Sequence, residues 1–139
     1  MPYTLLLNLN RIVEIRMILN QTQLTEMQEL LGDNFTMLLD IFLRDSKAQV
    51  DQISKWDSTS QDSEVLREAH NLKSSAANLG LNQLASQCDL IEAAFHTEKT
   101  EEVSGLIENI NSLYKESICL LYTSPSPRDA TLSRMPSSA

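Results

Sequence analysis

The side chains best suited to chemistry lie in the stretch His70–Gly80, which reads HNLKSSAANLG. Its histidine carries an imidazole that is mostly uncharged near neutral pH, since the ordinary pKa is about 6.5, and a neutral imidazole is a nucleophile. A positive charge follows three residues later at Lys73, and small side chains follow at Ser74 and Ala77. If the ring is exposed, the stretch therefore offers a nucleophile beside a cation, with little bulk to block a partner.

The direction of the ring depends on the helix that must carry it, which is predicted to run from Ser63 to Leu79. Its apolar residues recur at helical spacing and form one core-facing stripe, made of Val65, Ala69, Leu72, Ala76 and Leu79. His70 lies about 180° from this stripe, because each residue of a helix turns by about 100°. The outer face therefore presents His70, together with Ser63, Leu66, Arg67, Lys73, Ser74 and Ala77.

Two plainer interpretations of His70 stand beside a functional one. A core histidine satisfied by a hydrogen bond does not fit, because aliphatic side chains already fill the core side of the helix. An incidental surface histidine fits the residues and stays open at this point. The other histidine, His96, is interpreted as a solvated residue at the end of the next helix.

The stretch resembles the motif of the histidine-containing phosphotransfer (Hpt) domains of bacterial multistep phosphorelays. That motif reads roughly His-x-Leu-Lys-Gly-Ser/Ala-Ser/Ala, followed by a hydrophobic residue and Gly. The residues that match it are His70, Leu72, Lys73, Ser75, Ala76, Leu79 and Gly80. Ser74 departs from the usual glycine but remains small. The resemblance covers about Leu19–Ser117.

The resemblance implies a function for His70. A member of this family accepts a phosphoryl group on the histidine from a receiver-domain aspartate and passes it to another receiver. The expected partners are receiver domains of response regulators and a hybrid histidine kinase. Mg²⁺ is expected on the receiver, with no cofactor and no nucleotide-binding site on this chain. The chain is therefore expected to be a phosphoryl carrier and not an enzyme.

The resemblance also assigns roles to neighbouring residues. Lys73 would neutralise the charge of the phosphoryl group. Glu92, which lies 22 positions after the histidine where many members have glutamine, would orient the ring; a solvated boundary glutamate is the plainer alternative. Gly80 would let the next helix pack closely against the motif helix. The residues expected to contact a receiver are Leu66, Arg67, Ser74 and Ala77.

Two other functions compete with the carrier. The phosphoacceptor region of a sensor kinase also has a helical histidine, but it usually places an acidic residue just after it and a proline five residues on. Asn71 and Ser75 occupy those positions here, which disfavours that interpretation. A helical adaptor that is never phosphorylated, in which His70 is incidental, remains the main alternative.

Helical periodicity extends over most of the chain and predicts an all-α fold. Few helix breakers interrupt the middle, since the chain has three Gly and four Pro, and all four prolines lie near its ends. A short helix is predicted at 22–31, and four longer ones at 34–56, 63–79, 81–95 and 101–117. Long amphipathic helices with short connections predict an antiparallel up-down four-helix bundle, with the short N-terminal helix as a lid.

The ends of the chain are predicted to lie outside this domain, which is expected to span residues 19–117. Residues 1–18 are an uncertain N-terminal extension. Residues 118–139 are predicted to be a disordered or artefactual tail, because Ile118, Leu120, Leu121 and Tyr122 lie on no single stripe and the chain is then rich in Ser and Pro. The segment beginning CLLYTSPSPRD also resembles translated sequencing-adapter read-through.

Composition narrows the class of partner. A net charge of −8 disfavours nucleic acid, whose phosphates would repel the domain. No apolar run approaches the ~18 residues of a membrane span. Cys88 and Cys119 form neither a disulfide framework nor a metal-ligand spacing, so no metal site is predicted and a reducing, cytoplasmic location is expected. The domain is expected to be a monomer.

Overall fold

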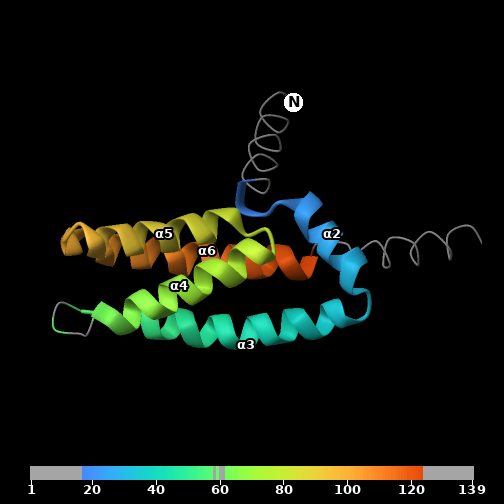
Figure 1. The fold of residues 1–139 in the computed structure, drawn as a ribbon, viewed down its shortest axis with the longest axis horizontal. Helices are drawn as coiled ribbons and strands as arrows, with labels where there is room; N and C mark the ends of the chain where they lie inside the picture. The colour runs from blue at the N-terminus through green and yellow to red at the C-terminus, as the bar shows by residue number, and fades with distance from the viewer. Residues whose placement is uncertain (1–16, 58, 60–61, 124–139) are drawn as a thin grey trace, which may run out of the picture.

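The computed structural model describes residues 17–57, 59 and 62–123. Its helices are α2 (Gln21–Leu31), α3 (Asn34–Ser54), α4 (Asp62–Asn78), α5 (Asn82–His96) and α6 (Val103–Thr123), and a 3₁₀ turn, Thr100–Glu102, precedes α6. Figure 1 shows α3 to α6 as long antiparallel helices and α2 as a shorter helix across one end of them. The predicted all-α bundle with a short N-terminal lid helix is confirmed.

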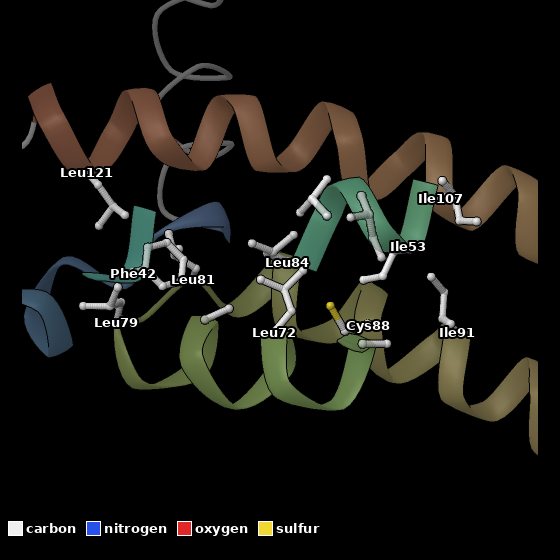
Figure 2. Close-up of a cluster of buried hydrophobic side chains, with 14 of the residues drawn as sticks. Phe42, Ile53, Leu72, Leu79, Leu81, Leu84, Cys88, Ile91, Ile107 and Leu121 are labelled. Atoms are coloured by element: carbon white, nitrogen blue, oxygen red, sulfur yellow. The ribbon is translucent and has the colours of Figure 1, made fainter. Parts of the chain in front are cut away.

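The core forms where the apolar stripes of the helices meet (Figure 2). Among its fully buried side chains are Ile53 of α3, Leu72 of α4, Leu84 and Ile91 of α5, and Ile110 of α6. Burying such a side chain stabilises the fold by about 1.5–3 kcal/mol relative to leaving it exposed. Because α4 also buries Val65, Ala69 and Ala76, its rotation about its own axis is fixed. The outward direction of His70 follows from this packing.

Helix α2 covers the end of α4. Leu24 is fully buried, and the Gln23 side-chain amide donates to the backbone oxygens of Ala77 (2.5 Å) and Asn78 (3.4 Å). The backbone N–H of Asn20 donates to the oxygen of Gly80 (2.8 Å). Carbonyl groups at a helix C-terminus lack partners within the helix. The lid therefore supplies hydrogen bonds that α4 cannot make for itself.

Gly80 follows the end of α4 in a conformation that suits glycine. Its φ of +80° lies in the left-handed region, and a Cβ at this position would come 2.9 Å from the backbone oxygen of Asn20. The nearest atoms to such a Cβ belong to Asn20 and Gln23, at the start of the lid. Both the φ angle and the close approach require glycine here.

Helix α6 continues to Thr123, six residues beyond the end predicted for this helix at Ser117. Leu121 is a core residue, and Ile118 and Leu120 pack against the core. Leu121 lies on the stripe of Ile110 and Tyr114, but the intervening position is a fully buried serine, Ser117, which interrupts the apolar pattern. The predictions for the remaining tail concern 124–139, outside the described residues.

The last two residues of the predicted N-terminal extension lie within the described residues. Ile18, which the sequence places in the extension, is buried beside Leu19. The rest of the extension, 1–16, lies outside the described residues. Of the helices that the structure describes, none is long and apolar enough to cross a membrane.

Candidate functional site

His70 lies near the middle of α4, with 63% of its side chain exposed. Its neighbours on the inner face, Ala69 and Leu72, are fully buried. The helix starts at Asp62, one residue before the predicted start. The negative charges of Asp62 and Glu64 in its first turn interact favourably with the positive end of the helix dipole. A stable helix with one buried stripe thus holds the imidazole in solvent, as the periodicity predicts.

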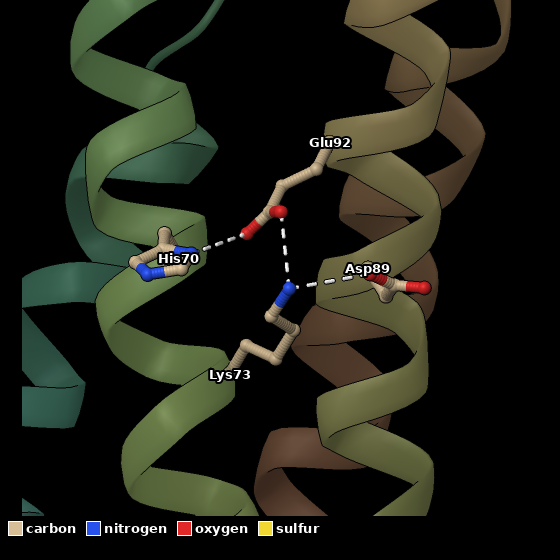
Figure 3. Close-up of polar contacts among 4 residues, drawn as sticks. All are labelled: His70, Lys73, Asp89 and Glu92. Atoms are coloured by element: carbon tan, nitrogen blue, oxygen red, sulfur yellow. Dashed lines mark hydrogen bonds and ion pairs between the residues drawn. The ribbon is translucent and has the colours of Figure 1, made fainter.

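Helix α5 packs beside α4 and brings two carboxylates to this site (Figure 3). Glu92 Oε1 lies 3.2 Å from Nδ1 of His70, and Glu92 Oε2 accepts a hydrogen bond of 3.1 Å from Nζ of Lys73. Asp89 Oδ1 accepts a second hydrogen bond from Lys73 Nζ, at 3.2 Å. One carboxylate therefore connects the ring to the ammonium, and a second carboxylate contacts the ammonium.

The position of Glu92 favours one tautomer of the neutral ring. A carboxylate can only accept a hydrogen bond, so Nδ1 carries the proton and donates it to Glu92. The lone pair is then on Nε2, and Figure 3 shows this other ring nitrogen directed away from Glu92. The exposed nitrogen of His70 is thus the nucleophilic one.

The ammonium of Lys73 is stabilised in its charged form. The hydrogen bond to Glu92, and next the hydrogen bond to Asp89, raise the pKa of Lys73 above its ordinary value. Glu92 itself is only 16% exposed, whereas Asp89 is 68% exposed. With a neutral imidazole, the four side chains carry one net negative charge.

The other predicted site residues lie around this cluster. Arg67 is exposed and forms an ion pair of 3.5 Å with Glu68, while Leu66 is half-buried. Ser74 and Ala77 are exposed on the same helix. The structure therefore brings both His70 and Lys73 into contact with Glu92 and leaves small side chains on the surface of α4.

Sequence reasoning missed Asp89. A signal was available, because Asp89 precedes Glu92 by three residues and so shares its face of α5. That Lys73 reaches both carboxylates depends on how α4 and α5 are set side by side. A single-helix pattern does not contain this information.

Cys88 lies on α5 next to Asp89, but its thiol is not a second nucleophile. Burial is the main cause that raises the pKa of Cys88 to about 12, with a smaller contribution from Glu92. Since the thiolate is the reactive form, this thiol is inert at neutral pH. Among residues 17–57, 59 and 62–123, no group of three or more His, Cys, Asp or Glu side chains is arranged to hold a metal ion.

Comparison with protein families gives one match, in which the model of the Hpt domain aligns with residues 37–118. The matched segment contains most of α3, all of α4 and α5, and α6 up to Ile118, and so includes every residue of the site. Comparisons with curated proteins and with solved structures gave no match.

Proposed function

Because the chain belongs to the Hpt domain family, we propose that it takes a phosphoryl group from the aspartate of one receiver domain onto His70 and passes it to another receiver. Hpt domains have a histidine phosphotransfer role in phosphorelays, typically interact with receiver domains, and are carriers and not kinases. The observation that carries the proposal is the exposed His70 ring, whose Nδ1 lies against Glu92.

The transfer step uses the free lone pair of the ring. Nε2 of His70 attacks the phosphorus atom, a P–N bond forms, the P–O bond breaks, and the receiver aspartate leaves as a carboxylate. The ring then carries a positive charge, which the Glu92 carboxylate stabilises through the proton on Nδ1. The same step in reverse delivers the group to the next receiver.

Positioning and charge neutralisation provide most of the catalysis in phosphoryl transfer. In this proposal the receiver supplies Mg²⁺ and the chain needs no cofactor of its own. Lys73 offsets the charge of the phosphoryl oxygens, and Leu66, Arg67, Ser74 and Ala77 form the surface that a receiver contacts. The proposal further implies a cytoplasmic monomer that works with a hybrid histidine kinase and response regulators.

Replacing the histidine tests this proposal. Wild type, His70→Gln and the matched control His96→Gln would each be incubated with phosphoramidate, a small phosphoryl donor, and with an aspartyl-phosphorylated receiver domain. Wild type and His96→Gln are expected to gain one acid-labile, alkali-stable phosphate, and His70→Gln none, with unchanged helical circular dichroism. Uptake by His70→Gln would contradict the assignment of His70 as the phosphoacceptor, whereas no uptake by the wild type from either donor would support the adaptor.

A further inference from the structure

The ammonium of Lys73 is already bound before any phosphoryl group arrives. It forms ion pairs with two carboxylates of α5, Asp89 at 3.2 Å and Glu92 at 3.1 Å (Figure 3). The second cation of α4, Arg67, is paired with Glu68. The positive charges of α4 are therefore shared with carboxylates in the unphosphorylated protein.

Phosphorylation adds negative charge to this cluster. Lys73, Asp89 and Glu92 together carry one net negative charge, and the phosphoryl oxygens bring nearly two more at neutral pH, partly offset by the positive charge that the ring gains. To neutralise that group, the ammonium must give up at least part of its contact with the two carboxylates. The two contacts thus compete with the phosphoryl oxygens for one cation.

We propose that Asp89 is a positioning residue which holds Lys73 on α5 and so makes the phosphorylated state of His70 less stable. This inference rests on the proposed function and adds a direction to it: the carrier is biased toward giving the phosphoryl group away and not toward storing it. Asp89 acts here through Lys73 and contacts neither the ring nor the reacting atoms.

Asp89 can be separated experimentally from Glu92. Glu92 binds both the ring and the ammonium, so changing it alters the tautomer of His70 as well as the charge. Asp89 binds the ammonium and is 68% exposed, so Asp89→Asn leaves the hydrogen bond between His70 and Glu92 in place. Loss of such an exposed ion pair has little effect on folding.

The equilibrium between the protein and free imidazole measures this bias without a partner protein. Phosphoramidate phosphorylates His70 when Nε2 attacks phosphorus and ammonia leaves. Free imidazole then takes the group reversibly, breaking one P–N bond and forming another. The ratio of phosphohistidine to phosphoimidazole, read by ³¹P NMR at fixed pH and salt, reports the relative stability of phosphorylated His70.

Asp89→Asn is expected to raise this ratio by about two- to fivefold, the range for one exposed ion pair. The ratio for Asp89→Glu should stay near that of the wild type, because this variant keeps the carboxylate. Glu108→Gln, which removes an exposed acid on α6, should also leave the ratio unchanged. In a Lys73→Met background, Asp89→Asn should have no effect, because the cation that it positions is gone.

An unchanged ratio in Asp89→Asn would overturn the inference. An equal increase of the ratio in Glu108→Gln would overturn it too, since the net charge of the protein would then be the cause. An undiminished effect of Asp89→Asn in the Lys73→Met background would also overturn it, because Asp89 would then repel the phosphoryl group directly. These outcomes differ from failure of the proposed function, in which wild-type His70 takes no phosphoryl group at all.

Discussion

At the scale of single residues, the site depends on the chemistry of one carboxylate. Glu92 uses one oxygen to accept from Nδ1 of His70 and the other to accept from Nζ of Lys73. Many Hpt domains carry glutamine at this position, and an amide has one accepting end and one donating end. Only a carboxylate can accept from the ring and from the ammonium through separate oxygens, which explains how the three side chains form one cluster here.

Lys73 is predicted to act in transfer and not in folding. Lys73→Ala should slow phosphotransfer by about tenfold, the effect of losing one charge-assisted contact of ~1.5 kcal/mol to the phosphoryl group. Rapid-quench measurements with a phosphorylated receiver would determine the rates. The transfer rate of Lys73→Arg should lie between those of the wild type and Lys73→Ala, since the guanidinium keeps the charge but is bulkier where a receiver approaches. Wild-type rates in Lys73→Ala, together with a lower thermal midpoint, would make Lys73 a structural residue.

At the scale of elements, the turn between α4 and α5 packs tightly against the lid. Gly80 has a φ of +80° and lies against the backbone of Asn20, so the end of α4, the lid and the start of α5 meet there. A shift at this turn would move Glu92 relative to His70. The lid therefore contributes to the geometry of the site although it holds none of its residues.

A pair of glycine substitutions tests the tightness of this turn. Gly80→Ala should lower the free energy of unfolding by about 1–3 kcal/mol, because it strains the backbone and forces the carbonyl of Asn20 away. The matched control is Gly105→Ala in α6, where an added Cβ meets open space; it should raise stability by about 0.5–1 kcal/mol. Urea denaturation measures both, and equal effects would contradict the tight approach at Gly80.

The extension of α6 past Ser117 leads to a second prediction for an element. Leu121→Ala should destabilise the protein by about 2–5 kcal/mol, because it removes a buried side chain from the core. Tyr122→Ala, at the next position, should change stability by less than about 0.5 kcal/mol, since Tyr122 is exposed. Similar thermal midpoints for the two variants would mean that α6 does not pack beyond Ser117.

At the scale of the whole molecule, the pKa shifts resolved for the described residues all have the same sign. The pKa of the Cys88 thiol is raised mainly by burial, the pKa of Tyr114 is raised mainly by burial, and the pKa of Lys73 is raised by its carboxylate partners. In each case the folded protein holds a proton that the unfolded chain releases at lower pH. Stability from these groups is therefore complete below their ordinary pKa values and is lost as the pH rises above them.

The fold is accordingly predicted to be sensitive to alkali. The contribution of Cys88 to the free energy of unfolding is expected to fall as the pH rises from the ordinary pKa of the thiol, 9.0, to its raised pKa of about 12. The slope is at most about 1.4 kcal/mol per pH unit for one proton. Urea denaturation between pH 8 and pH 11 should show the free energy of unfolding falling. Cys88→Ala should be less stable at pH 8 but show a shallower fall. Identical slopes in the two proteins would contradict the assignment to this thiol.

Apolar periodicity by itself determined much of this protein. The stripe of Val65, Ala69, Leu72 and Ala76 predicted both the helix and the outward direction of His70, and both are observed. Similar stripes predicted the bundle. Such predictions succeed because burial of one face of a helix depends on residues within that helix. The role of Glu92 was predicted differently, through the family's spacing of 22 residues.

Tertiary structure alone decided how neighbouring elements meet. The contact of Lys73 with Asp89, the approach of Asn20 to Gly80, and the end of α6 at Thr123 were not predicted from the sequence. The first two depend on the axial position and rotation of one helix against another, which the packing of the whole core sets. The third was not predicted because Ser117 is polar and interrupts the apolar stripe, although it is small enough to be buried in the core.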